Sequence, residues 1–590
     1  MCGIFSFISK GKISKKDILL GKKGTKLLYH RGPNGSGEWV DRSKGIYIGH
    51  RRLKIIDLSE KAKQPMIRKN IVLSYNGEIY NFKEIRENLI KKGFKFTSTS
   101  DTEVLINLWL DKGPSCLNEI DGMFSFIIWD GKNIWIARDK FGEKQLFYAI
   151  TKNGIYISSE IQPLVEITKF KKDLDQNKIS AFLSLGYIPS PDTAYKNIYS
   201  LEPSTLIKIN KGVIIKKIKY WKEKKLHNLD KREINNKYIN DFHEALIDSV
   251  KSRITSDAKR CLFLSSGIDS SLIASIIAKD LNIKIPCITV SFEKQYNEIN
   301  KAKEISKYLK LPHYTSNFSR KKINSSLINR LYGQPNDNLT IISVIKMCSL
   351  AKKLNFKVGI TGMGGDEISQ GYLKQLFIYK YRFLYSLPEK IRKLIYFFTF
   401  LLLNQKKRLL YKNIFGVDNK YLYIALKNLP ILTYLSSLEG FDKWCLKTFK
   451  DFSNINFYKK VCEFDIENVM SNSRLACFDL GGMNESIELR SPLLNHKLFS
   501  LYNSLSLNNL NKFGQKYILK EILKRYLPEK LITKNKKGFV YPMSYFSIEN
   551  KKNSKNSYLT ENSNIIDLEK EYSWQKIRMR ENILKNFVNY

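Results

Sequence analysis

The chain reads Cys261-Leu262-Phe263-Leu264-Ser265-Ser266-Gly267-Ile268-Asp269-Ser270-Ser271 at the point where an apolar run gives way to small polar residues. The first four residues predict a buried strand, and the segment 271–281 predicts a helix after it. Small residues at such a turn let backbone N–H groups approach a phosphate, and the helix N-terminus favours the anion. The G-x-x-x-x-G-K pattern of a Walker loop is absent. Taken alone, the stretch fits either a phosphate loop of another type or an ordinary serine-rich turn.

Residues 236–545 continue this alternation of strands and helices. Cys287-Ile288-Thr289-Val290 and Val358-Gly359-Ile360-Thr361 are strand-like, with helical segments between them. Alternating strands and helices predict a doubly wound α/β fold with a parallel sheet. From about 375 to 530 the pattern is mostly helical, and residues 546–590 are expected to form a polar tail with one helix.

Residues 1–205 show a different pattern of many short strands, separated by turn signals such as Asp130-Gly131 and Asn153-Gly154. Helical stretches are expected near 16–30, 81–92 and 101–112. This pattern predicts a layered α+β domain. The segment 206–235 is expected to connect the two domains as a strand pair followed by a charged linker.

The composition is that of a globular protein with a large positive charge. The 590 residues are 43% hydrophobic and carry a formal charge of +44. Lysine is spread along the whole chain and no nucleic-acid-binding motif is visible, so we expect no nucleic-acid partner. The eight cysteines form no C-x-x-C pair, which argues against a zinc site or a disulfide framework and favours a cytoplasmic location.

The most apolar stretch runs from Leu394 to Leu403 and is followed by Lys406, Lys407 and Arg408. It is shorter than the roughly 20 residues that cross a bilayer, so no transmembrane segment is expected. Two interpretations stay open for it, a buried helix and a helix that lies on a membrane surface.

The first residues are Met1-Cys2-Gly3, and removal of the initiator methionine would leave a thiol and a free α-amine on Cys2. The thiolate is a nucleophile, and an α-amine titrates near ~7.7–8.0, so it is a usable base at neutral pH. Cys2 is therefore a candidate nucleophile, although many chains start with Met-Cys by chance.

Several polar clusters in the N-terminal half end strands or open helices. Each alone fits a turn or a helix cap. Together with Cys2-Gly3-Ile4 they resemble the glutaminase domain of class II amidotransferases, which are N-terminal-nucleophile hydrolases of layered αββα fold. The clusters are His30-Arg31-Gly32-Pro33, Gly49-His50-Arg51-Arg52-Leu53, Asn76-Gly77-Glu78-Ile79-Tyr80-Asn81 and Ser100-Asp101-Thr102-Glu103.

The resemblance implies specific roles at a glutamine site. Cys2 would attack the side-chain amide of glutamine while its own amine relays the proton. The Asn76 side chain and the Gly77 backbone N–H would hold the oxyanion. The contacts implied for the substrate itself are Arg52 with the α-carboxylate, and Glu78 and Asp101 with the α-ammonium group.

Three motifs in the second half follow the loop at 265–270. They are Gly362-Met363-Gly364-Gly365-Asp366-Glu367, Glu488-Leu489-Arg490-Ser491-Pro492-Leu493-Leu494-Asn495-His496 and Lys534-Asn535-Lys536-Lys537-Gly538-Phe539. In this order, behind a glutaminase, they resemble the asparagine synthetase family, whose second domain is an ATP pyrophosphatase. The resemblance implies ATP and Mg²⁺ as cofactors, adenylation of aspartate and its amidation by ammonia.

The family pattern also implies the residues of the second site. It places Ser265, Gly267, Asp269, Ser270, Gly362 and Asp366 on ATP, Asp269 and Asp366 also on the metal, and Lys536 on the charge of the adenylating phosphate. Leu264 and Val290 would flank the adenine, although both also fit an ordinary core strand.

Position 363 departs from the family pattern. The family usually has Glu or Asp between these glycines, where it can accept a proton from the attacking ammonia, and Met363 cannot. Further departures are Ser266, Ser369-Gln370, Leu480 and Asn495. The acceptor is thus expected to be aspartate or another carboxylate, for instance a uronic acid of a surface polysaccharide. A glutaminase whose second half binds nucleotide without ligating, and a homodimer, stay open.

Overall fold

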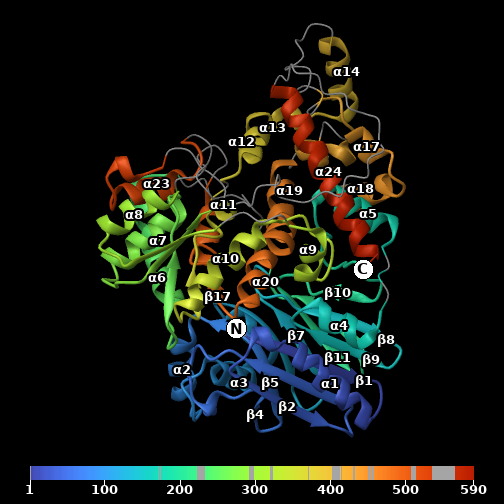
Figure 1. The fold of residues 1–590 in the computed structure, drawn as a ribbon, viewed down its shortest axis with the longest axis vertical. Helices are drawn as coiled ribbons and strands as arrows, with labels where there is room; N and C mark the ends of the chain where they lie inside the picture. The colour runs from blue at the N-terminus through green and yellow to red at the C-terminus, as the bar shows by residue number, and fades with distance from the viewer. Residues whose placement is uncertain are drawn as a thin grey trace.

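The computed structural model describes residues 2–170, 172, 174–221, 233–291, 298–318, 323–369, 371–400, 412, 415–428, 432–449, 452, 457–505, 513–533 and 565–589. Two layered sheets form one end of the molecule, and a parallel sheet and a largely helical region lie beyond them (Figure 1).

Two six-stranded antiparallel sheets form the centre of the N-terminal domain. The first contains β1 (Gly3–Ser9), β2 (Gly35–Asp41), β3 (Ile46–Arg52), β8 (Phe147–Thr151), β9 (Gly154–Ser158) and β10 (Ile198–Ser200), in the order β10-β8-β9-β1-β3-β2. The second contains β4 (Met66–Arg68), β5 (Ile71–Ile79), β6 (Gly122–Trp129), β7 (Ile134–Arg138), β11 (Thr205–Asn210) and β12 (Val213–Lys219), in the order β12-β11-β7-β6-β5-β4.

The alternation of side chains along β1 explains the layers. Ile4 and Ile8 join an isoleucine-rich core with residues of both sheets, such as Ile127. Phe5 and Phe7 point to the other face, where α1 (Lys15–Leu27) packs; a Cβ at Gly24 of this helix would lie 2.4 Å from the Phe5 ring. The other helices are α4 (Ile161–Thr168) on the first sheet, α3 (Asp101–Lys112) on the second, α2 (Phe82–Lys91) packed on α3, and α5 (Gln176–Leu185). The predicted αββα arrangement is confirmed.

The second domain is built on a five-stranded parallel sheet, as predicted. Its strands are β13 (Arg260–Phe263), β14 (Cys287–Ser291), β15 (His313–Asn317), β16 (Val358–Ile360) and β17 (Glu488–Arg490), in the order β15-β14-β13-β16-β17. After β13 the chain adds β14 and β15 on one side of this strand, and it then adds β16 and β17 on the other side. The gap between the ends of β13 and β16 is thus the topological switch point, where ligands bind in open α/β sheets.

Helices surround this sheet and make up most of the remaining elements in the described part of the second half. Those connected to the sheet are α6 (Asn236–Arg253), α7 (Ile268–Lys279), α8 (Glu298–Tyr308), α9 (Ser325–Tyr332), α10 (Thr340–Lys353), α11 (Gly365–Ile368), α20 (Ala476–Asn484), α21 (His496–Ser504) and α23 (Tyr517–Lys524). The others are α12 (Leu373–Lys380), α13 (Arg382–Tyr385), α14 (Glu389–Phe400), α16 (Leu422–Asn428), α17 (Leu432–Ser436), α18 (Phe441–Phe449), α19 (Phe457–Phe464), a π-helix (Asp465–Leu475) and α24 (Ile565–Asn589).

The helix expected in the C-terminal tail is α24, and it packs against the body of the protein (Figure 1). Ile577, Ile583 and Phe587 are buried. Arg580 donates to Asp337 at 2.7 Å and to the backbone oxygen of Ser184 at 3.3 Å. Ser184 belongs to α5 of the N-terminal domain, and Asp337 follows α9 in the second domain. Arg580 of α24 therefore contacts both domains.

The strand pair expected in the connecting segment is the hairpin β11–β12. It pairs with β7 and so extends the second sheet of the N-terminal domain. The domain limits at 205, 235 and 545 stay a prediction. Among the described residues, no helix is both long enough and apolar enough to cross a membrane.

Candidate functional site

Cys2 lies directly before β1, at a pocket lined by residues of the N-terminal domain. The thiol is buried. Residues from four separate segments line the pocket with it: Arg52, Leu53, Ile55, Ile56, Ala62, Gln64, Tyr75, Gly77, Glu78, Ser100, Asp101 and Thr102. The structure thus brings together Cys2, Arg52, Gly77, Glu78 and Asp101, which the sequence analysis had grouped from distant motifs.

Asn76 does not line the pocket but holds the backbone of the nucleophile. Its Oδ1 accepts a hydrogen bond from the Cys2 nitrogen at 2.8 Å, and its Nδ2 lies 3.4 Å from Ser125 Oγ. Gly77 follows in β5, where a Cβ would lie 2.2 Å from the carbonyl oxygen of Met123 on β6. Only glycine therefore fits the backbone beside the nucleophile.

Burial governs protonation around Cys2. It raises the pKa of the Cys2 thiol, which is therefore protonated at neutral pH and needs a base in order to attack. It lowers the pKa of His50 to about 3, so this imidazole is neutral at pH 7. Its Nδ1 forms a hydrogen bond with Ser74 Oγ at 2.9 Å. Burial raises the pKa of Asp101 to about 6, although hydrogen bonds from the Ile79 N–H and the Tyr75 hydroxyl lower that pKa in part.

Arg490 of the second domain reaches into the glutamine pocket. Its Nη2 lies 3.1 Å from Glu78 Oε1, and its Nε donates to Glu488 at 2.6 Å. Burial, opposed by Arg490, raises the pKa of Glu78. The backbone oxygen of Arg490 accepts from the Thr361 N–H at 2.9 Å, directly before Gly362. One residue of β17 therefore contacts both a pocket acid of the first domain and the loop of the second site. The sequence analysis quoted Arg490 within a motif but gave it no role.

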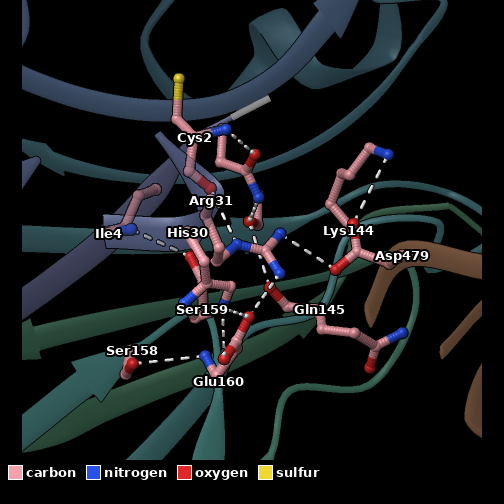
Figure 2. Close-up of polar contacts among 12 residues, drawn as sticks. Cys2, Ile4, His30, Arg31, Lys144, Gln145, Ser158, Ser159, Glu160 and Asp479 are labelled. Atoms are coloured by element: carbon pink, nitrogen blue, oxygen red, sulfur yellow. Dashed lines mark hydrogen bonds and ion pairs between the residues drawn. The ribbon is translucent and has the colours of Figure 1, made fainter. Parts of the chain in front are cut away.

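A second buried contact between the domains lies beneath Cys2 (Figure 2). The Arg31 guanidinium is fully buried and donates to the Cys2 carbonyl at 3.0 Å, to Glu160 at 2.9 Å and to Asp479 of α20 at 3.0 Å. Burial works against the charge of Glu160, yet His30 and Arg31 together lower its pKa to about 2. The backbone of the nucleophile is thus tied to the second domain through one arginine.

The second pocket lies at the switch point of the parallel sheet. Ser270 closes the loop that leads into α7: its hydroxyl accepts from the Ser265 N–H at 3.1 Å. The loop after β16 packs directly on it, because a Cβ at Gly365 would lie 2.5 Å from the Asp269 carboxyl group. The pocket is lined by Phe263, Leu264, Ser265, Gly267, Asp269, Ser270, Ile288, Thr289, Val290, Met347, Thr361, Gly362, Met363 and Phe478.

Seven of the residues predicted to bind ATP line this pocket: Leu264, Ser265, Gly267, Asp269, Ser270, Val290 and Gly362. Asp366 lies next to it, because Asp269 and Asp366 share one cation. Lys516 Nζ is 2.5 Å from Asp269 Oδ2 and 2.7 Å from Asp366 Oδ1. Lys536 lies outside the described residues.

Lys516 is a functional candidate that the sequence analysis missed, since no motif marks it. Its backbone has φ +54°, an uncommon conformation for a lysine, and precedes α23. Two carboxylates that converge on one cation fit a Mg²⁺ site, because Mg²⁺ is commonly held by one or two carboxylates together with substrate phosphates. We found no cluster of three or more potential metal ligands in the described part of the chain.

One departure from the family pattern, Asn495, has a local explanation. Asn495 caps α21 with its Oδ1, while its Nδ2 lies 3.3 Å from Asp121 Oδ2, a contact that an aspartate could not make without repulsion. The Ser266 carbonyl accepts from Thr533 at 2.6 Å, a backbone contact that any residue at this position could make, so it does not explain the serine. Nothing in the structure explains Leu480.

The two halves of the chain match two protein families. Residues 1–221 match the glutamine amidotransferase domain, and residues 241–563 match asparagine synthase. A putative glutamine-hydrolysing asparagine synthetase 2 of Methanocaldococcus jannaschii is 31% identical over 66% of this chain and 79% of its own length. Glutamine-hydrolysing asparagine synthetase 1 of Bacillus subtilis is 27% identical over 92% and 88%. The amidase chry2 of Gibberella zeae is 24% identical over 63% and 59%.

Proposed function

We propose, since the chain belongs to the asparagine synthase family, that it hydrolyses glutamine and uses the ammonia to convert aspartate to asparagine with ATP. The observation that carries the proposal is the assembly of two pockets in one chain, one around Cys2 and one around the loop 265–270, with Arg490 in contact with both. Such an arrangement suits the production of ammonia at one site and its use at another.

The first half-reaction uses the pocket residues around Cys2. Loss of Met1 would free the Cys2 amine at the nitrogen that Asn76 now holds, and this amine takes the thiol proton as sulfur attacks the glutamine amide. The Gly77 N–H would stabilise the oxyanion, and the Asn76 amide group would join it by exchanging its 3.4 Å contact with Ser125 for the substrate. Ammonia leaves, and water then releases glutamate. Arg52, Glu78 and Asp101 hold the α-carboxylate and the α-ammonium group of the substrate.

The second half-reaction uses the switch-point pocket. The loop 265–270 and the N-terminus of α7 bind the phosphates of ATP, while Leu264 and Val290 contact the adenine. Asp269 and Asp366 would hold Mg²⁺, which neutralises phosphate charge when bound. The aspartate carboxylate attacks the α-phosphate and displaces pyrophosphate, and ammonia then displaces AMP. Lys536 would neutralise charge on the reacting phosphate.

A second candidate is the amidation of a different carboxylate. Met363, Met347 and Phe478 make one wall of the pocket apolar, and Met363 offers no proton acceptor where the family usually has an acid. An acceptor other than aspartate that can pack on this wall suits it better, for instance a uronic acid through the C–H face of its ring. The location would be cytoplasmic, and the oligomer could be a homodimer.

The test is pyrophosphate release from the purified protein with ATP, Mg²⁺ and glutamine, with and without aspartate. We expect release that depends on aspartate, in step with asparagine formation. Glutamine hydrolysis without aspartate-dependent release would reject aspartate and favour the second candidate. Release with a panel of other carboxylates then distinguishes a changed acceptor from a second domain that no longer ligates.

A further inference from the structure

The far end of the helical region exposes a cluster of large apolar side chains. α14 lies at the end of the molecule opposite the N-terminal sheets, with α13 beside it (Figure 1). We call the exposed residues of these two helices the tip patch: Phe383 (75% exposed), Phe397 (70%), Phe398 (65%), Leu394 (56%) and Ile391 (45%). Scattered exposed apolar residues are normal, but the four on α14 lie within eight residues of one helix, and such a group indicates an interaction surface.

α14 carries apolar side chains on its exposed face as well as on the side that packs against the protein. Ile391, Leu394 and Phe398 are spaced i, i+3 and i+7 and so share one face, which is exposed. The side that faces the protein carries Ile395 and Tyr396, which pack against the core, and Arg392, which is fully buried and donates to Asn419. An ordinary amphipathic helix buries its apolar stripe and exposes its charges. The contacts of α14 therefore hold one apolar face outward.

Polar contacts at the start of α14 fix this orientation. The Glu389 carboxylate accepts from the Asn419 backbone N–H at 2.9 Å, and Lys393 bridges Glu389 at 2.9 Å and Asp418 at 2.5 Å. The apolar residues take part in none of these contacts. Exposure of the patch is thus a consequence of how the helix is anchored.

Positive charge surrounds the tip patch. Lys380, Arg382, Lys390 and Lys393 are exposed on α12, α13 and α14. The sequence 371–400 contains six basic residues and a single acid, Glu389, which Lys393 already pairs. An apolar face with a basic rim is complementary to an anionic lipid surface, whose phosphates attract the rim while its acyl boundary accepts the apolar side chains.

We propose that the tip patch docks this protein on the surface of an anionic lipid bilayer. A nucleic acid would use the basic rim, but it offers nothing to Ile391 and Leu394. The residues of the patch line neither of the two pockets, so docking sets the location of the enzyme and leaves its chemistry unchanged. The inference is independent of the acceptor carboxylate.

The test is flotation of the full-length protein with vesicles of phosphatidylcholine alone or with one third phosphatidylglycerol. We expect binding to the anionic vesicles only, weakened about tenfold by Phe397→Ser together with Phe398→Ser, because two of the most exposed rings no longer enter the bilayer. Lys390→Glu with Arg382→Glu should weaken binding to a similar degree and remove its dependence on salt.

The matched control is Leu19→Ser with Ile67→Ser, two side chains of the N-terminal domain that are 66% and 57% exposed. This variant should bind like the unmodified protein, and all variants should keep glutaminase activity, which shows that they fold. Equal binding by the Phe397/Phe398 variant would mean that general positive charge suffices and would overturn the proposal. Absence of vesicle binding, or a dimer that only this variant disrupts, would overturn it as well.

Discussion

The pocket around Cys2 and the pocket around the loop 265–270 differ in how they are built. The first places Arg52, Glu78 and Asp101 around a buried thiol, and every residue of the family pattern is present. The second has an apolar wall with Met363 at the position of the usual acid. The difference indicates that recognition of glutamine leaves little freedom for change, while the acceptor side of the same enzyme can be altered.

The largest expected effect separates the two pockets completely. Cys2→Ala removes the nucleophile, so glutamine-dependent product formation should fall more than about 10⁴-fold. Synthesis from added ammonium chloride should persist near its original rate, because the second pocket is untouched. Parallel assays of product with each nitrogen donor check this. Glutamine hydrolysis that survives in Cys2→Ala would disprove the role of Cys2.

The next effect concerns the charges of the second pocket. Lys516→Met leaves the carboxylates of Asp269 and Asp366 without their shared lysine, which should cost about 3–5 kcal/mol of stability in the absence of metal. Added Mg²⁺ should restore much of that loss, since it supplies the missing charge. Thermal unfolding with and without Mg²⁺ measures both quantities.

Pyrophosphate release by Lys516→Met should also fall, by about 10²–10³-fold. Lys520→Met on the same helix is the matched control, and it should change neither stability nor its response to Mg²⁺. A Lys516→Met protein that is as stable as the control without metal would show that Lys516 does not balance the two acids.

Much of this architecture was predictable because it rests on local patterns. Alternating side chains mark β1, small polar residues mark the turn after β13, and glycines mark the loop around Asp366. Each of these signals lies in neighbouring residues of the sequence. The residues that the sequence did not reveal act across the fold. Arg490 meets Glu78, and Lys516 meets Asp269, only because separate domains or helices pack together. A lone Lys or Arg carries no sequence signal for such a partner.

The third prediction tests whether the second pocket has lost a function or gained one. Met363→Glu returns a proton acceptor to the loop, so aspartate amidation should rise about 10–100-fold if aspartate is the acceptor. Met363→Gln has a similar size without a basic carboxylate, and it should give no such gain. Steady-state asparagine formation is the measurement. A loss of activity in Met363→Glu would favour an acceptor that uses the apolar wall.

The smallest expected effect is a pH dependence confined to the first pocket. Burial raises the pKa of Asp101 to about 6, so its carboxylate is ionised above that pH and protonated below it. Only the ionised form attracts the α-ammonium group of glutamine, so this titration should lower kcat/KM for glutamine about tenfold from pH 7 to pH 5, in addition to the decline caused by protonation of the Cys2 amine. Asp101→Asn should have a low kcat/KM that lacks this tenfold component of the decline, while Glu60→Gln, an exposed acid of the same domain, should keep the original profile. Aspartate-dependent synthesis from ammonia, corrected for the fraction of free NH₃, should not follow this titration. If both nitrogen donors showed the same decline, the titrating group would belong to the shared second pocket, and the contrast between the two pockets would lose its electrostatic basis.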